Sequence, residues 1–233
     1  MEKKIGRLPV SLFTAVTAIA VFFLRKAQLL QVDETGKLLA GAGKGPLTWV
    51  CVIFALLAAL YAVSMKKRDE MAKRSYVATA VTLAAAFCMA MGSAVMLTYS
   101  SIMAVLGLVA AVCWVVVALQ RHQNTEPSAI LFMLPTLFYA VELIVQFRDW
   151  SMDPQVLDYG FSLLTGICTM CASFHLGGFG FRKGKRRLTA FYCMVGVIFA
   201  AAAMAGAHIV NMLTVGGSTL WLLANLWLLL EKE

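Results

Sequence analysis

Charged residues are scarce in this chain, and their scarcity decides its class. Only 14% of the 233 residues are Asp, Glu, Lys or Arg, whereas soluble domains carry about a quarter. Apolar residues make up 61% of the chain, and the mean hydropathy is +0.81. Too few polar side chains are present to cover a water-facing surface. The sequence therefore predicts an all-helical, polytopic membrane protein, folded as a single transmembrane domain over residues 1–233.

The predicted loops also lack cysteine, since all six cysteines lie inside apolar runs. We therefore predict reduced thiols and no structural disulfide. No nucleotide-binding loop and no zinc-ligand spacing occurs, so we predict no cofactor and no metal. In a soluble protein the net charge of +8 would suggest nucleic acid. In a membrane protein it indicates basic residues retained on the cytoplasmic side, so we predict no nucleic-acid partner.

Charge separates six apolar stretches, at 8–24, 47–65, 75–120, 128–147, 156–181 and 188–230. About 20 helical residues suffice to cross the hydrocarbon core. The stretches 75–120 and 188–230 are about twice that length and contain no charged residue, so each must fold as two helices. We place the turns at Leu97–Ser100 and Thr214–Ser218. Eight transmembrane helices result, or seven if 214–230 does not span.

The basic residues indicate which end of each helix is cytoplasmic. With the N-terminus inside, the inner segments hold 15 of the 20 basic residues, while the 12 acids divide evenly between the two sides. This asymmetry follows the positive-inside rule. We predict an integral protein of a bacterial plasma membrane with both termini cytoplasmic. Its surroundings are then the lipid bilayer and, as a further hypothesis, other copies of itself in a homo-oligomer.

The two halves of the chain resemble each other. Ala90–Ala94 aligns with Ala203–Ala207 at an offset of 113 residues, and the same offset pairs Lys73-Arg74 with Arg186-Arg187. We therefore predict a parallel four-plus-four internal duplication with halves 1–120 and 128–233. Parallel repeats about an axis along the membrane normal occur in several transporters.

An acidic residue inside an apolar run is the main candidate for function. Glu142 lies six residues before Arg148, roughly 9 Å below the outer boundary. Ionisable residues within a bilayer are usually paired or functional. We predict an outward-facing polar pocket between the fifth, sixth and seventh helices, with Glu142 paired to Arg25 or Lys26. The predicted residues for binding a small solute or ion are Glu142, Asp158, His208, Asn211, Arg25 and Lys26.

A structural explanation competes for three of these residues. Arg25 and Lys26 end the first helix and can extend their charges toward the headgroups. Asp158 lies in the first turn of the sixth helix, where an acidic side chain favours the helix N-terminus. Taken singly, these residues are more simply explained as interfacial anchors.

Three enzymatic constellations are weaker candidates. Cys168 and Cys171 have the spacing of thiol redox motifs, but no outer-loop cysteine exists to exchange with them. Ser93 and His208 could form a serine–histidine dyad, faintly similar to that of rhomboid-type proteases. His175 and His208 differ in depth by roughly 20 Å, which excludes a haem held between them. We predict no catalytic residue.

These observations lead to a leading hypothesis and two alternatives. In the first, a multi-pass protein binds or transports a small solute or ion through its outward-facing pocket. In the second, it is a non-catalytic partner or sensor subunit whose helices present packing faces. In the third and least favoured, it is an intramembrane hydrolase or a thiol oxidoreductase.

Overall fold

The computed structural model describes residues 7–30, 45–65, 75–150 and 156–230, and within them it contains eight α-helices and no strand. All eight are long and apolar enough to cross a membrane. This confirms the prediction of an eight-helix integral membrane protein. The seven-helix alternative is wrong, because the last helix has 22 residues. The helices are α1 (Arg7–Leu29), α2 (Pro46–Ser64), α3 (Tyr76–Met96), α4 (Ser101–His122), α5 (Ile130–Trp150), α6 (Val156–Gly180), α7 (Arg186–Met204) and α8 (Ile209–Leu230).

The outer surface of the bundle is apolar. On α2, large hydrophobic side chains are exposed along the helix from Trp49 to Val63, and Leu60 is 69% exposed. A soluble monomer rarely leaves so large an apolar patch in water. Lipid contact explains this surface.

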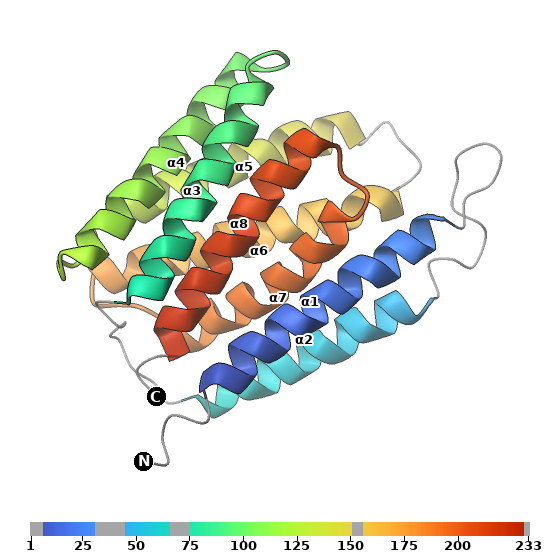
Figure 1. The fold of residues 1–233 in the computed structure, drawn as a ribbon, viewed down its shortest axis with the longest axis horizontal. Coiled ribbons are helices and arrows are strands. Elements are labelled where there is room, and N and C mark those ends of the chain that lie inside the picture. The colour runs from blue at the N-terminus through green and yellow to red at the C-terminus, as the bar shows by residue number, and fades with distance from the viewer. Residues whose placement is uncertain (1–6, 31–44, 66–74, 151–155, 231–233) are drawn as a thin grey trace.

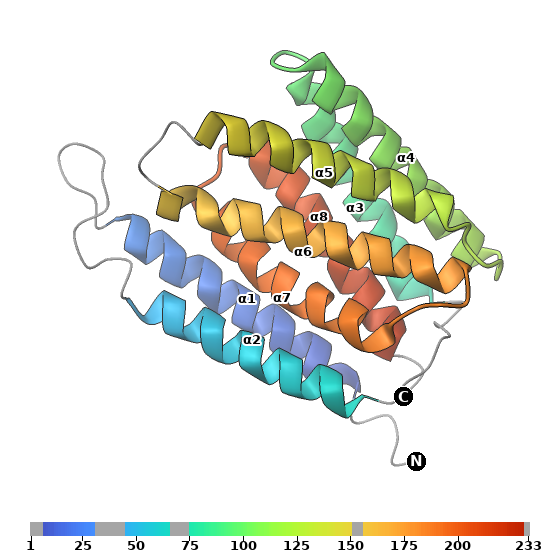
Figure 2. The same cartoon turned by 180° about the vertical axis from the view of Figure 1, so that it is seen from behind.

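The helices run alternately up and down, so α1 begins and α8 ends at the same end of the bundle (Figures 1 and 2). α8 packs between α3 and α7, and α6 packs between α5 and α7. α4 packs on α3 and α5, whereas α1 and α2 pack chiefly on α7. The helices α7 and α8 are consequently the most buried of the eight.

Small residues allow α3 and α8 to approach closely. A Cβ atom added to Gly217 would lie 2.9 Å from the carbonyl oxygen of Ala85 and 3.1 Å from the amide nitrogen of Met89. A Cβ atom added to Gly92 would lie 2.6 Å from Cγ2 of Thr214. Close backbone approach at glycine is how membrane helices gain packing energy, because lipid gives no hydrophobic drive for their association.

The contact between α3 and α4 depends on one glycine and one serine. A Cβ atom added to Gly107 would lie 2.2 Å from Oγ of Ser93, whose side chain is fully buried. The Ser93 hydroxyl has no hydrogen-bond partner in the part of the chain that the structure describes. Ser93 therefore occupies the space that an alanine at position 107 would need.

We expect Gly107→Ala to lower the free energy of unfolding by about 1–3 kcal/mol, because the added methyl overpacks this contact. The Ser93→Gly change in the same chain should restore most of the loss, since it removes the clashing hydroxymethyl group. Denaturant unfolding in detergent micelles measures both effects. Additive losses in the double variant would contradict the contact.

The turn predicted at Leu97–Ser100 is confirmed, because α3 ends at Met96 and α4 begins at Ser101. The turn predicted at Thr214–Ser218 is wrong. The chain turns at 205–208 instead, and residues 214–218 lie inside α8. The hydroxyl of Ser218 donates to the carbonyl oxygen of Thr214 at 2.8 Å, a bond that keeps serine compatible with a helix in lipid.

Two arginines at the beginning of α7 bind the last turns of neighbouring helices. Arg186 is buried and donates through Nε and Nη2 to the carbonyl oxygen of Leu229, near the end of α8. Nε of Arg187 donates to the carbonyl oxygen of Met65, just after α2, at 2.7 Å. Carbonyl groups at helix C-termini have no partner within their own helix, and a cation also suits the negative end of the helix dipole.

The internal duplication remains a prediction. A parallel four-plus-four repeat would make the pairs α2–α3 and α6–α7 equivalent. In the described residues α6 packs extensively on α7, whereas α2 and α3 share no comparable contact. The equivalent pairs α3–α4 and α7–α8 both pack closely, so the packing agrees with the repeat at one pair and differs at the other.

Candidate functional site

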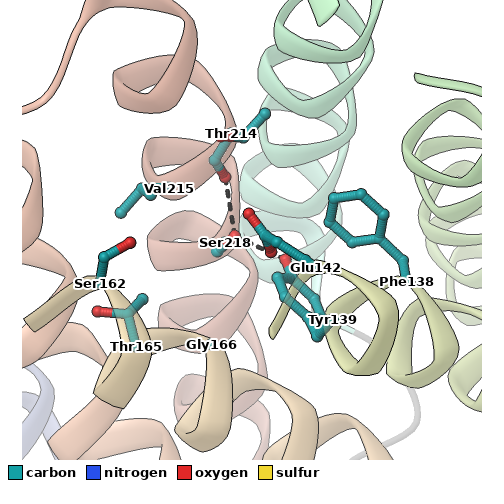
Figure 3. A pocket seen from close by; sticks show the side chains of 9 residues that line it. All are labelled: Phe138, Tyr139, Glu142, Ser162, Thr165, Gly166, Thr214, Val215 and Ser218. Atoms are coloured by element: carbon teal, nitrogen blue, oxygen red, sulfur yellow. Dashed lines mark hydrogen bonds between the residues drawn. The ribbon is translucent and has the colours of Figure 1, made fainter. Parts of the chain in front are cut away.

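A narrow cleft lies between α5, α6 and α8, toward the end of the bundle where α5 ends and α6 and α8 begin (Figure 3). The sequence predicted a pocket between the fifth, sixth and seventh helices, so α8 takes the expected place of α7. This difference follows from the misplaced turn, which assigned 209–213 of α8 to the seventh helix and 214–218 to the turn itself. The lining residues are Phe138, Tyr139, Glu142, Ser162, Thr165, Gly166, Thr214, Val215 and Ser218.

Glu142 is the acidic residue of this cleft. Its half-buried side chain extends from α5 toward α8, as Figure 3 shows. Oε1 accepts a hydrogen bond from Nε2 of Gln146, one turn further along α5, at 3.1 Å. Glu142 has no other hydrogen bond and no ion pair with the residues that the structure describes. A carboxylate oxygen is thus left for an occupant of the cleft.

A chain of hydrogen bonds links α5 to α8 beside this carboxylate. The oxygens of Tyr139 and Ser218 lie 2.6 Å apart. Because the Ser218 hydroxyl already donates to Thr214, we infer that Tyr139 is the donor to Ser218. The lone pairs of the Tyr139 oxygen then remain as acceptors.

The threonine hydroxyls of the lining also direct their protons to backbone carbonyls. Thr165 donates to Phe161 at 2.7 Å, and Thr214 donates to Asn211 at 3.2 Å. With these protons committed, the oxygens can only accept further hydrogen bonds. The described cleft therefore offers a carboxylate and several acceptor oxygens, a lining that suits a cation or a proton donor.

The size of the cleft limits what it can hold. Its total volume is about 270 Å³, including space open to the outside. The part that a water-sized sphere can occupy is only about one water molecule in size. An organic solute does not fit between these side chains in this conformation, whereas a water molecule, a hydronium ion or a small bare cation does.

The basic residues at the end of α1 are not part of this lining. Arg25 is buried, donates from Nη1 to Oε1 of Gln28 at 2.7 Å, and lies over the ring of Phe161 on α6 at 5.3 Å. Lys26 is exposed. The predicted pairing of Glu142 with one of these two residues is absent, and Arg25 instead packs on the residue next to Ser162 of the cleft.

Two of the other predicted site residues, His208 and Asn211, lie at the beginning of α8. His208 was expected within the seventh helix but is exposed in the turn between α7 and α8. Asn211 is exposed in the first turn of α8. Neither residue lines the cleft. Asp158 lies in α6, but the structure describes only its backbone and not its side chain.

The enzymatic constellations find little support. The Ser93 hydroxyl is buried without a hydrogen-bond partner among the described residues, while His208 is exposed, so the two do not form a dyad. Cys168 and Cys171 are free thiols within α6, as predicted for reduced cysteines. No group of three or more His, Cys, Asp or Glu residues in the described chain could hold a metal ion.

Sequence reasoning missed most of the cleft. Of its nine lining residues it named only Glu142 as a site residue. Tyr139 was treated as an apolar neighbour of Glu142, and Ser218 was placed in a turn. The available signal was a helical spacing: Thr214 and Ser218 are four residues apart, which places them on one face of a helix.

Comparison with known proteins adds no relative. No protein-family model, no curated protein and no solved structure matches this chain. The geometry of the cleft is therefore the basis for a functional conclusion.

Proposed function

We propose that this integral membrane protein binds a small cation or a proton at Glu142, through a cleft open to the outer side of the membrane. The observation that carries the proposal is the lining, in which a half-buried carboxylate lies among hydroxyl oxygens. The hydroxyls of Thr165, Thr214 and Ser218 already donate their protons to backbone carbonyls. Hard cations prefer such oxygen ligands. The narrowness of the cleft favours an occupant no larger than water.

The sidedness of the site is part of the same proposal. The positive-inside count supports a cytoplasmic location for both termini, with 15 of the 20 basic residues on that side. The end of α5 and the beginnings of α6 and α8 then face outward. The cleft would therefore take its occupant from outside a bacterial plasma membrane, and the four-plus-four duplication would be a legacy of transporter-like ancestry.

The test uses an apolar carbodiimide, which reacts with protonated carboxyl groups inside membrane proteins. We expect the reagent to label Glu142 in the purified protein, and we expect Li⁺ or Na⁺ to slow that labelling several-fold. Rising pH should also slow it, because the reactive form loses its proton. Peptide mass spectrometry locates and quantifies the adduct.

Thermal unfolding in detergent gives an independent measurement. A bound cation should raise the midpoint temperature of unfolding by mass action. The stabilisation is about 2.7 kcal/mol when the cation concentration is roughly one hundred times its Kd. Glu142→Gln should abolish this shift, whereas Glu126→Gln, in the exposed loop after α4, should retain it.

A lack of any response to cations and pH would overturn the proposal. If Li⁺, Na⁺, K⁺ and pH all leave both the labelling rate and the unfolding midpoint unchanged, Glu142 does not bind a cation or a proton. A stoichiometric partner that co-purifies from native membranes would then favour the partner-subunit alternative.

A further inference from the structure

The polar residues of the cleft continue inward along one face of α8. Thr214, Ser218, Trp221 and Asn225 follow one another at spacings of four, three and four residues, which places all of them on one side of the helix. All four are buried. Thr214 and Ser218 line the cleft, whereas Asn225 lies near the opposite end of α8.

A second polar group lies at that inner end. Nη2 of Arg121, at the end of α4, donates to Oδ1 of Asn225 at 2.9 Å. Nδ2 of Asn225 donates to the carbonyl oxygen of Trp221 at 2.8 Å, within α8. The Arg121 guanidinium also lies 5.7 Å from the ring centroid of Phe132 and 5.9 Å from that of Trp221. A buried positive charge is thus held on this column, on the far side of Trp221 from the cleft.

Two stacked tryptophans separate the cleft from this inner group. The rings of Trp114 on α4 and Trp221 on α8 stack with centroids 4.8 Å apart and an interplanar angle of 12°. Both side chains are fully buried, near the middle of their helices. One face of α4 carries Gly107, Trp114 and Arg121 at seven-residue spacing. This face therefore passes first the cleft, then the tryptophan pair, and then the Arg121–Asn225 group.

Unsatisfied polar atoms accompany the tryptophan pair. Neither indole N–H group has a hydrogen-bond partner in the residues that the structure describes, and neither does the hydroxyl of Ser93. Ser93 lies at the level of the cleft, because its contact Gly107 also lies against Phe138 of the cleft. Buried polar groups without protein partners commonly bind internal water. The Ser93 hydroxyl and the two indole donors are therefore groups that internal water could satisfy.

We propose that the Trp114–Trp221 pair is the permeation barrier between the outer cleft and the inner Arg121–Asn225 group. This inference rests on the proposed function, since the occupant that it stops is the cation or proton bound at Glu142. The stacked rings exclude water from the middle of the column, as apolar constrictions do in channels. The structure is then the state that is open outward and closed inward.

Proton flux into liposomes tests the barrier. The full-length protein is reconstituted with a trapped pH-sensitive dye, and a K⁺ gradient with valinomycin supplies the driving potential. We expect Trp114→Ala to speed proton entry by about tenfold or more over the unaltered protein. A decrease of about 1.4 kcal/mol in the activation free energy raises a rate tenfold. Trp114→Phe should stay close to the unaltered rate, because an aromatic ring still stacks on Trp221.

Two matched controls distinguish the path from a general leak. Trp49→Ala removes a tryptophan that is 66% exposed on the lipid-facing side of α2, and it should leave the flux unchanged. The double variant Trp114→Ala with Glu142→Gln should lose most of the added flux, because protons enter the column through the cleft. High flux in the double variant would mean a non-specific leak and would overturn the proposal.

The outcomes also separate this inference from the proposed function. If folded Trp114→Ala protein conducts no faster than the unaltered protein, the barrier is elsewhere, while cation protection of Glu142 can still hold. If Trp114→Ala does not fold, Trp221→Ala removes the other ring of the pair from α8. An unchanged flux in folded Trp221→Ala would equally overturn the assignment.

Discussion

Replacing Gly217 with leucine is expected to prevent the assembly of the bundle. The side chain would begin at a Cβ position 2.9 Å from a backbone oxygen of α3, which cannot move aside without shifting the whole helix. We expect α8 still to insert into lipid but to remain separated from α3. The purified variant should aggregate during size-exclusion chromatography in detergent, whereas we expect the unaltered protein to elute as one peak.

The adjacent glycine provides a matched control. A Cβ atom added to Gly216 would meet only Sδ of Met204, at an ordinary contact distance of 3.7 Å. Gly217→Ala should therefore lower the free energy of unfolding by about 1–3 kcal/mol. Gly216→Ala should be neutral or stabilising, because alanine favours a helix over glycine by about 1 kcal/mol. Equal effects at the two positions would contradict the close approach of α3 to α8.

Asn225→Leu is expected to destabilise the protein by about 2–3 kcal/mol. The change removes the acceptor that Asn225 offers to Arg121, and a hydrogen bond to a charged group contributes about 1.5–3 kcal/mol. Leucine is close to asparagine in size, so the loss reports the polar contact rather than a cavity. Reversible denaturation in mixed micelles measures the change in free energy.

The same substitution at Asn211 is its control. Asn211 lies on the same helix but is exposed in its first turn, so Asn211→Leu should change stability by less than about 0.5 kcal/mol. If the two variants unfolded alike, the Arg121–Asn225 bond would make no net contribution. The pair would then be a means of orienting the guanidinium rather than a source of stability.

Hydropathy alone was enough to predict the eight helices. Each helix must cover its own backbone with apolar side chains over about 20 residues. The lengths of the apolar runs therefore determine how many times the chain crosses the membrane. The even helix count, and hence the shared end of α1 and α8, follows from the same runs. The turn at 97–100 was predictable because it lies midway along an uncharged stretch of double length.

The second turn was misplaced for a physical reason. Thr214, Gly216, Gly217 and Ser218 resemble a loop by composition, and in water such residues favour turns. In lipid the hydroxyls bond to carbonyls one turn earlier, and glycine serves helix packing instead. Ala205 and Gly206 begin the actual turn, although they belong to the segment Ala203–Ala207, which aligns with Ala90–Ala94 inside α3.

Only the acidic residue of the candidate site was predictable from the sequence. Glu142 stood out because a carboxylate in an apolar run is costly, whatever the neighbouring helices are. Its partners Tyr139 and Ser218 depend on which helices adjoin, and hydropathy does not determine adjacency. Arg121 was counted only among the basic residues of the inner side. Its burial against α8 follows from packing that the charge count cannot show.

The position of α1 and α2 has a consequence for biosynthesis. The α1–α2 hairpin docks chiefly on α7, which is synthesised only after four further helices. Until then α1 and α2 must wait in the bilayer, or at the insertion machinery, without their main docking surface. In a nascent chain released before α7, this hairpin would lack its docking surface, and both of its helices would be exposed to membrane quality-control proteases.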